Sequence, residues 1–369
     1  MLLIKTQRDM LLSPLQSVSG IVEKRHTLPI LSNVLLEKKG EQLTLLATDI
    51  EIQITTTTGG AVGDSDGAIT VGARKLQDIL RSLPEGTEIS LNLDEKRLQV
   101  RAGKSRFSLQ TLPAEDFPRM ALADGSLGKI TVTRKQFRQL LAQTQFAMAA
   151  QDVRYYLNGL LLMVDGPDLR AVATDGHRLA YASMALDGGA LPKQEFILPR
   201  KTVLELNRLL DDSDEPLNIE FASNQIRFQF GQINLVSKLI DGKFPDYERV
   251  IPAAPRNLLS LNRAQLLQAM VRAAILTNEK FRGVRLVVGS GLLKIMAANA
   301  EQEEAQEEIE INFDGDPIDV GFNVGYLLDV LNNTSSETIE WGFNDANSSA
   351  LITLPGNERF KYVVMPMRI

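Results

Sequence analysis

Hydrophobic side chains recur at helical spacing in three places along the chain. The first set is Leu11, Leu15, Val18 and Val22, the second is Phe137, Leu140, Leu141 and Thr144, and the third is Leu267, Met270, Val271 and Ala274. Residues spaced in this way lie on one face of a helix. After each helix, apolar and polar residues alternate, which predicts strands within residues 43–54, 169–182 and 292–311.

A second helix of the same kind follows each group of strands. Its apolar positions are Leu76, Ile79, Leu80 and Leu83, then Val203, Leu206 and Leu210, then Leu327, Val330 and Leu331. Further strands come after each of these helices, so every third of the chain predicts an α+β domain of two helices backed by antiparallel sheet. Pro14 lies inside the first helical pattern and predicts either a kink or a later helix start.

Two short sequence motifs each occur twice, in the same order and with nearly the same separation between the copies. Ala-Thr-Asp stands at 47–49 and 173–175, and Phe-Pro at 117–118 and 244–245. This agreement indicates duplication of a whole domain. Turn-rich segments at 121–128 and 251–257 separate the copies. We therefore expect three domains, which are residues 1–125, 126–254 and 255–369.

Composition narrows the class of protein. A chain of 369 residues with 44% hydrophobic and 23% charged residues is typical of folded globular domains. It has no cysteine, which excludes disulfides, thiolate metal sites and cysteine nucleophiles, and it has two histidines. There is no apolar run of membrane-spanning length and no secretion signal pattern, so we expect a cytoplasmic protein without a membrane partner.

Candidate catalytic and ligand-binding motifs fail on their spacing. Gly-Lys-Ser at 103–105 lacks the earlier glycine of a phosphate-binding loop, because Leu98 stands there, and a strand pattern follows. Asp-Ser-Asp-Gly at 64–67 lacks the remaining ligands of a calcium loop. The glutamates of 301–308 have no apolar pocket pattern around them and are typical of solvated charge. The sequence thus predicts no catalytic set, no metal and no cofactor.

Basic residues recur at the start of equivalent helices. The second helices of the first two repeats begin with Arg74-Lys75 and Arg200-Lys201, whereas the third has Val324-Gly325. One interpretation is ordinary solvated helix surface. The other is a basic stripe that neutralises DNA phosphates, which a net charge of −6 permits if the 40 Lys and Arg side chains gather on one face.

Opposite charges mark the two ends of the domain array. A basic strand pattern at 104–109 belongs to the first repeat, and the acidic segment 301–308 belongs to the third. They are either charged surface or the two halves of a head-to-tail contact between chains. For that contact we expect Lys104, Arg106, Phe107 and Leu109 to meet Ile275, Leu276, Glu303 and Glu304.

Longer sequence motifs show a family resemblance over the full length of the chain. They are HTLPILSN at 26–33, QDVRYYLNG at 151–159, ATDGHRLA at 173–180, SKLIDGKFPDY at 237–247, NEKFRGVRL at 278–286 and YVVMPMRI at 362–369. The chain closely resembles the beta sliding clamps of bacterial DNA polymerase III. The resemblance implies a homodimeric, six-domain ring that encircles double-stranded DNA and gives the polymerase processivity without catalysis.

The resemblance also implies two sets of site residues. Those implied to contact DNA are Arg25, Arg74, Lys75, Gln151, Tyr155, Tyr156, Arg200, Lys201, Arg272 and Arg282. The two tyrosines suit stacking on single-stranded bases, or else packing at a strand start. Ala150 departs from relatives with histidine there, which weakens a DNA contact at that position.

The second set forms a pocket for short peptides of the polymerase III alpha subunit, the clamp loader and repair proteins. Its residues are Leu157, Thr174, Gly176, His177, Arg178, Leu179, Pro245, Arg249, Val250, Phe281, Asn323, Tyr326, Ser349, Val363, Val364, Met365, Pro366, Met367 and Arg368. Apolar and methionine side chains there suit Leu or Phe anchors. Without the resemblance, the last strand and His177 suggest an ordinary strand and turn. Asn347 stands where relatives often have a small apolar residue.

Three other functions stay open at this point. A clamp-like ring devoted to repair or to plasmid replication fits the same residues. A sequence-specific DNA-binding regulator is disfavoured because no helix-turn-helix or zinc spacing is present. A hydrolase using scattered carboxylates is disfavoured by the scarcity of histidine and the lack of cysteine.

Overall fold

The computed structural model describes residues 2–23, 28–94, 97–121, 125–187, 191–253 and 255–368. Contacts divide the chain into two compact units. The first unit holds residues 1–135 and 204–239, and the second holds 136–203 and 240–369. Both units therefore include part of the second repeat.

Each repeat contributes two helices and eight strands to the described residues. The first contributes β1 Leu2–Gln7, α1 Arg8–Ser19, β2 Asn33–Lys39, β3 Gln42–Thr48, β4 Ile52–Thr58, β5 Gly67–Gly72, α2 Ala73–Ser82, β6 Glu88–Asp94, β7 Arg97–Ala102 and β8 Ser105–Leu112. The second contributes β9 Gly128–Thr133, α3 Arg134–Ala142, β10 Gly159–Gly166, β11 Asp168–Thr174, β12 Arg178–Ala185, β13 Leu191–Pro199, α4 Arg200–Leu209, β14 Pro216–Phe221, β15 Gln225–Phe230 and β16 Ile233–Lys238. The third contributes β17 Asn257–Asn262, α5 Arg263–Ala274, β18 Gly283–Gly289, β19 Leu292–Ala298, β20 Glu304–Glu310, β21 Ile318–Asn323, α6 Val324–Asn332, β22 Thr338–Phe343, β23 Ala350–Leu354 and β24 Asn357–Val364. Short 3₁₀ turns are η1 Pro29–Ser32, η2 Ala114–Asp116, η3 Gln145–Ala147, η4 Tyr155–Asn158 and η5 Tyr247–Arg249.

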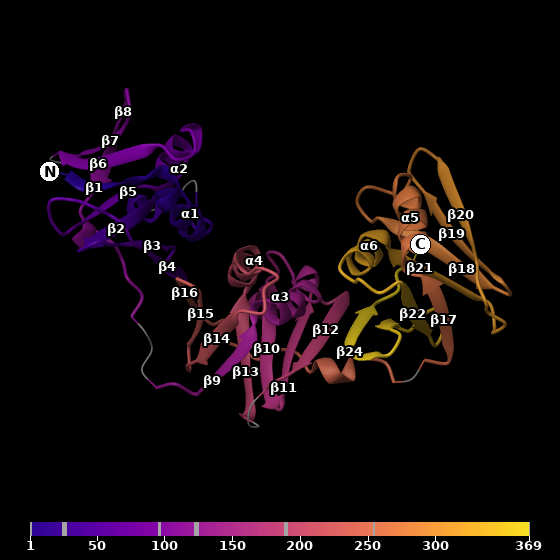
Figure 1. The fold of residues 1–369 in the computed structure, drawn as a ribbon. Helices are drawn as coiled ribbons and strands as arrows, with labels where there is room; N and C mark the ends of the chain where they lie inside the picture. Colours follow the sequence, from indigo (N-terminus) through magenta and orange to yellow (C-terminus); the bar gives the residue numbers. More distant parts are fainter. Residues whose placement is uncertain are drawn as a thin grey trace. The chain divides into compact units, whose positions relative to one another are not determined.

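One antiparallel sheet runs through the first unit. Its strand order is β1-β6-β7-β8-β5-β2-β3-β4-β16-β15-β14-β9. Strand β4 of the first repeat pairs with β16 of the second, with Ile54 opposite Leu235 (Figure 1), so backbone hydrogen bonds join the two repeats. Helices α1 and α2 pack together, and α1 buries Leu11, Leu15 and Val18.

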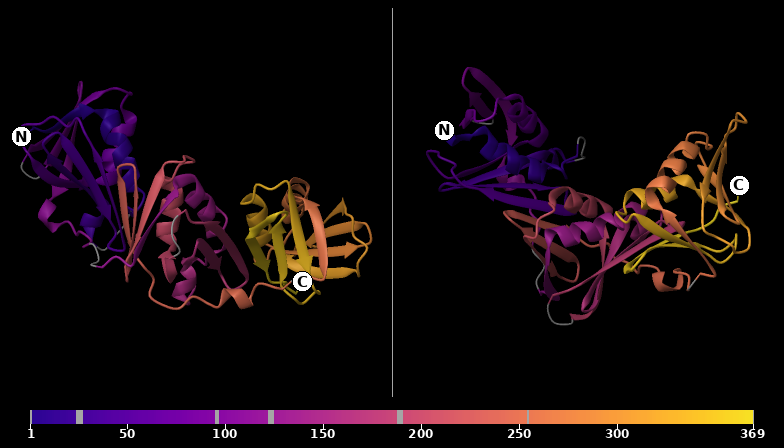
Figure 2. Two further views of the ribbon diagram at one scale, coloured as in Figure 1. Left: turned by 60° about the horizontal axis from the view of Figure 1, so that its bottom comes forward. Right: turned by 45° about the vertical axis from the view of Figure 1, so that its right-hand side comes forward.

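The second unit contains two antiparallel sheets. Its larger sheet has the order β13-β10-β11-β12-β24-β23-β22-β17, and its smaller sheet the order β20-β19-β18-β21. Strand β12 of the second repeat pairs with β24 of the third, with Leu179 opposite Val363. Helices α5 and α6 lie next to each other in the third repeat, as the views in Figure 2 also show in orange and yellow.

The structure corrects one helix prediction and decides between the alternatives of another. Helix α5 buries Leu266, Ala269, Met270 and Ala273, whereas Val271 of the predicted stripe is half exposed. The predicted face was wrong by about one position because the helix carries apolar doublets, and packing against α6, β19 and β20 selects between the two faces. Helix α1 starts at Arg8 with Pro14 inside it, so a later start is excluded.

Candidate functional site

A pocket of about 200 Å³ lies in the second unit, where the second and third repeats share a sheet. The β11–β12 turn, the segment around η5 and the end of β24 surround it. Its lining residues are Arg154, Tyr156, Leu157, Thr174, Gly176, His177, Arg178, Leu179, Pro245, Tyr247, Val250, Val363 and Met365. The pocket is open to solvent at its rim, where Val250 and Met365 are partly exposed.

The floor of the pocket is a rigid apolar surface. Leu157, Leu179 and Val363 are almost fully buried, and Leu179 and Val363 belong to a packed cluster that includes Phe244 and Tyr247. Met365 adds an unbranched, polarizable side chain at the rim, which adapts to differently shaped partners. Such a surface is suited to apolar side chains.

The turn between β11 and β12 forms one wall. One Asp175 carboxylate oxygen accepts hydrogen bonds from the amides of His177 at 2.9 Å and Arg178 at 3.1 Å. Gly176 has a φ of +89°, and a Cβ built there would lie 2.9 Å from an Arg154 Nη. Glycine is therefore required twice, by backbone conformation and by the approach of Arg154.

Replacing Gly176 with Ala is expected to weaken peptide binding several-fold, because a left-handed alanine costs about 1–2 kcal/mol and Arg154 must move. Gly166→Ala is the matched control, since Gly166 has a φ of +59° in the same unit with no atom within 4 Å of its Cβ position. Peptide titration and thermal unfolding of both variants separate the effects. Equal losses of peptide affinity in the two variants would show that the Arg154 contact is irrelevant.

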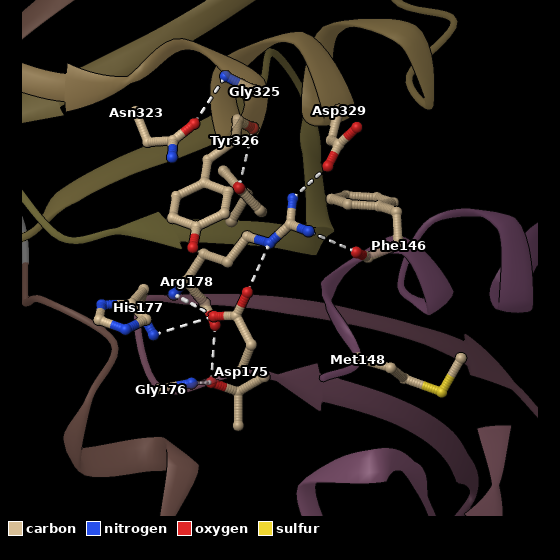
Figure 3. Close-up of polar contacts among 12 residues, drawn as sticks. Phe146, Met148, Asp175, Gly176, His177, Arg178, Asn323, Gly325, Tyr326 and Asp329 are labelled. Atoms are coloured by element: carbon tan, nitrogen blue, oxygen red, sulfur yellow. Dashed lines mark hydrogen bonds and ion pairs between the residues drawn. The ribbon is translucent and has the colours of Figure 1, made fainter. Parts of the chain in front are cut away.

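Arg178 ties this wall to the third repeat (Figure 3). Its guanidinium donates to Asp175 at 3.2 Å, to Asp329 of α6 at 2.5 Å and to the Phe146 carbonyl at 2.7 Å. The side chain is only 9% exposed. Burial opposes its charge, but the electrostatic effect of Tyr362 and the hydrogen bond to Asp329 outweigh it and raise the pKa of Arg178. Arg178 therefore carries a permanent, fully partnered charge beside the pocket.

Aromatic rings also pack against Arg178 and His177. The Tyr326 ring lies 4.5 Å from the Arg178 guanidinium carbon and stacks on the ring of His177, with the ring centroids 6.4 Å apart. The Tyr362 hydroxyl donates to the Tyr326 carbonyl at 2.9 Å. Burial raises the pKa of Tyr362, so its hydroxyl stays protonated as a donor.

The loop before η4 presents side chains to solvent from a fixed backbone. Hydrogen bonds from the Arg154 side chain and amide lower the pKa of Asp152 to about 2. The Asn158 side chain accepts from the amide of Asp152 and donates to its carbonyl, each at 2.8 Å. Gln151 has a φ of +63°, and Tyr155 is mostly exposed. The Tyr155 ring packs edge-on against the Tyr156 ring, with the ring centroids 5.8 Å apart.

The structure gathers many of the residues implied for the peptide pocket. Those that line it are Leu157, Thr174, Gly176, His177, Arg178, Leu179, Pro245, Val250, Val363 and Met365. The residues that do not line it are Arg249, Phe281, Asn323, Tyr326, Ser349, Val364, Pro366, Met367 and Arg368. Some of these have other contacts: Arg249 pairs with Asp246 at 2.8 Å, Asn323 caps α6, and Val364 is buried.

Three lining residues were not predicted for the pocket. Tyr156 was implied only for DNA, and Arg154 and Tyr247 were not named. Tyr247 stands two residues after Pro245 in the repeated Phe-Pro segment, so that segment offered a signal. Arg154 has no sequence signal, because its role depends on the turn at Gly176.

The residues implied for DNA lie in both units. Arg74 and Lys75 are exposed at the start of α2, where an Arg74 Nη donates to the Val22 carbonyl at 3.0 Å. Arg200 and Lys201 start α4 and are partly buried, and an Arg200 Nη donates to the Met148 carbonyl at 3.2 Å. A common basic stripe across the repeats stays a prediction.

In the third repeat, the two implied arginines differ in their environment. Arg272 forms a two-pronged ion pair with Glu307, at 2.8 and 2.6 Å, which neutralises part of its charge. This pairing raises the pKa of Arg272 and lowers that of Glu307. Arg282 is exposed and has a φ of +50°. Arg25 lies outside the described residues.

The two charged segments both lie on sheet edges. Residues 105–110 of β8 pair with β7 on one side, and only Thr111 and Leu112 pair with β5 on the other. Strand β20 ends the smaller sheet, with Glu304 exposed at its start. Glu303 is exposed and bonded to Asn299 in the turn before β20, and Lys104 is exposed in the turn before β8. Ile275, after α5, is 74% exposed.

Within the described ranges, no three His, Cys, Asp or Glu side chains form a group that could hold a metal ion. In the same part of the chain, no helix is long and apolar enough to cross a membrane.

Each of the three repeats has two helices backed by antiparallel sheet, and the strand pairs β4–β16 and β12–β24 join the repeats edge to edge. This arrangement defines the class of DNA clamps. Three family models of the DNA polymerase III beta subunit together match most of the chain. The N-terminal domain model covers residues 2–121, the central domain model 131–246 and the C-terminal domain model 248–368.

Individual relatives agree with this class. The beta sliding clamps of Pseudomonas aeruginosa and Escherichia coli K12 are 49% and 48% identical over 363 residues, which is 98% of this chain and 99% of each relative. A crystal structure of the P. aeruginosa sliding clamp bound to griselimycin has a TM-score of 0.95 at 48% identity, with both chains fully covered. The Caulobacter crescentus polymerase III beta structure has a TM-score of 0.92 at 41% identity, covering 99% of this chain and all of the other.

The chain therefore belongs to the beta sliding clamps, the beta subunits of bacterial DNA polymerase III. Its function is that of a processivity factor of DNA polymerase III, and it is not an enzyme.

Proposed function

We propose that two chains close head to tail into a ring of six domains around double-stranded DNA. The exposed basic edge of β8, which carries Arg106 and Phe107, supports this assembly because it complements the acidic edge of β20. Antiparallel strands with open edges pair readily, and opposite charges fix their partner. In this proposal each chain contributes domains at residues 1–125, 126–254 and 255–369 and acts in the bacterial cytoplasm.

DNA contact in this ring is directed at phosphates and not at bases. The arginine and lysine side chains at the starts of α2 and α4 are suited to this role, together with Gln151 and the exposed Tyr155 on their fixed loop. Phosphate contacts carry no sequence information, so the ring slides while topology retains it.

The pocket at Leu179 and Val363 serves as the tether for partner proteins. Its apolar floor, flexible Met365 rim and fully partnered Arg178 support capture of short peptides with Leu or Phe anchors. We infer that the alpha subunit of polymerase III, the clamp loader and repair proteins present such peptides. The observation that carries this proposal is an open apolar pocket built from two repeats on a rigid sheet.

If the protein encircles DNA, its retention on a plasmid is expected to depend on whether the plasmid is circular or linear. Protein loaded on a nicked circular plasmid by a clamp loader is expected to co-elute with the plasmid in gel filtration. After the plasmid is cut once, the protein is expected to leave, because a ring slides off free ends. Protein that stays on the linear DNA in the same buffer would instead show direct, tight binding.

A further inference from the structure

We propose that Asp329, which does not line the pocket, is a positioning residue for peptide capture and acts through Arg178. The proposal rests on the proposed function of the pocket. It assigns to helix α6 of the third repeat a role in shaping a wall that belongs to the second repeat (Figure 3).

A series of hydrogen bonds connects helix α6 with the pocket. Asp329 accepts from Arg178 at 2.5 Å, and Arg178 donates onward to the second Asp175 carboxylate oxygen at 3.2 Å. The first Asp175 oxygen holds the amide of His177 at 2.9 Å, and the His177 carbonyl accepts from the amide of Met365 at 2.9 Å. Arg178, His177 and Met365 line the pocket, and Asp175, which does not line it, connects Arg178 with His177. The orientation of the wall thus depends on where Arg178 points.

The burial of Arg178 makes the loss of its partner Asp329 consequential. The Arg178 side chain is 9% exposed and the Asp329 side chain 44% exposed, so the arginine is the desolvated member of the pair. Removing one partner of a buried charge leaves that charge undercompensated, and it then moves toward water or toward its other partners. Without Asp329, Arg178 keeps Asp175, the Phe146 carbonyl and the Tyr326 ring as partners, so its guanidinium shifts and the position of Asp175 shifts with it.

Tyr326 also holds the Arg178 side chain in place. It lies one helical turn before Asp329 on α6, so both side chains project from one face. Its ring packs against Arg178 and against His177. Helix α6 therefore fixes Arg178 at two points, by ion pairing and by a cation–π contact. A shift of α6 changes the pocket wall, although no α6 residue lines the pocket.

The test measures binding of a fluorescein-labelled peptide with Leu and Phe anchors to the full-length protein by anisotropy. Asp329→Ala is expected to weaken binding about tenfold, the size of a typical coupling between sites, and Asp329→Glu is expected to restore most of the loss. In the Asp329→Ala, Arg178→Ala double variant, binding is expected to match Arg178→Ala alone, because the two residues act as one unit.

Asp319→Ala is the matched control. Asp319 also pairs with an arginine of the third repeat, Arg285, at 2.8 and 2.5 Å, but neither lines the pocket. This variant is expected to bind peptide like the wild type. Retention on nicked circular DNA is expected to be unchanged in every variant. If Asp329→Ala fails to fold in thermal unfolding, Asp329→Asn, which keeps the side-chain volume, replaces it.

Two outcomes overturn the inference. Binding by Asp329→Ala within about twofold of wild type, or losses that simply add in the double variant, would show that Asp329 does not act through Arg178. A wild-type protein that does not bind the peptide at all would overturn the proposed pocket itself, which is a distinguishable result.

Discussion

Removal of residues 365–369 is expected to abolish peptide binding while leaving the protein folded and able to encircle DNA. Met365 is part of the pocket rim, and its amide donates to the His177 carbonyl at 2.9 Å, so the deletion removes both a binding surface and a support of the opposite wall. The sheet is expected to survive, since β24 ends at Val364 and stays paired with β12 and β23. Affinity for the labelled peptide is expected to fall by at least about 30-fold, because losing the rim side chain together with a support of the opposite wall is expected to cost about 2 kcal/mol or more.

A chain that ends at Met367 is the control for this deletion. It keeps the Met365 contact and the bond from the Met367 amide to the Gly321 carbonyl at 2.8 Å. It is therefore expected to bind peptide nearly as the full chain does. Unchanged peptide affinity in the shorter chain that lacks Met365, measured by the same titration, would refute the placement of the partner site at this end of β24.

The repeat and the helix positions could be predicted from the sequence, because they depend on local periodicity. The β11–β12 turn could also be predicted, since Ala-Thr-Asp recurs and Gly176 marks a left-handed position. The buried face of α5 could not, because Leu266 and Leu267, like Met270 and Val271, are equally apolar neighbours. Only the packing partners decide which of two adjacent faces is buried.

The pocket was predicted through a family resemblance and not through spacing. Nothing local connects Arg178 with Asp329, which lie in different repeats, or Arg272 with Glu307, which lie on a helix and a strand. Arg272 illustrates the limit, because the resemblance implied it only as a DNA contact, and the structure gives it a carboxylate partner. Pairing of this kind depends on how elements pack, which a single sequence does not contain.

Substitution of Ile275 by Asp is expected to convert the proposed dimer into monomers. Ile275 is 74% exposed in the single chain and follows α5, which packs against the acidic edge strand β20. In the proposed ring it is buried against the Phe107 and Leu109 edge of β8. Loss of that burial costs on the order of 2–3 kcal/mol at each interface, and the new carboxylate adds an unpaired charge inside the interface.

A closed ring has two identical interfaces, so one substitution weakens both at once. We therefore expect the dissociation constant of the dimer to rise by at least about 100-fold, seen in sedimentation velocity at sub-micromolar concentration. Retention on nicked circular DNA is expected to be lost with it, whereas peptide binding is kept, because the pocket lies wholly within one chain. Leu127→Asp, at a half-exposed apolar residue outside both edges, is expected to stay dimeric. A stable dimer of the Ile275→Asp variant would place the subunit contact elsewhere and leave the basic β8 edge without its proposed partner.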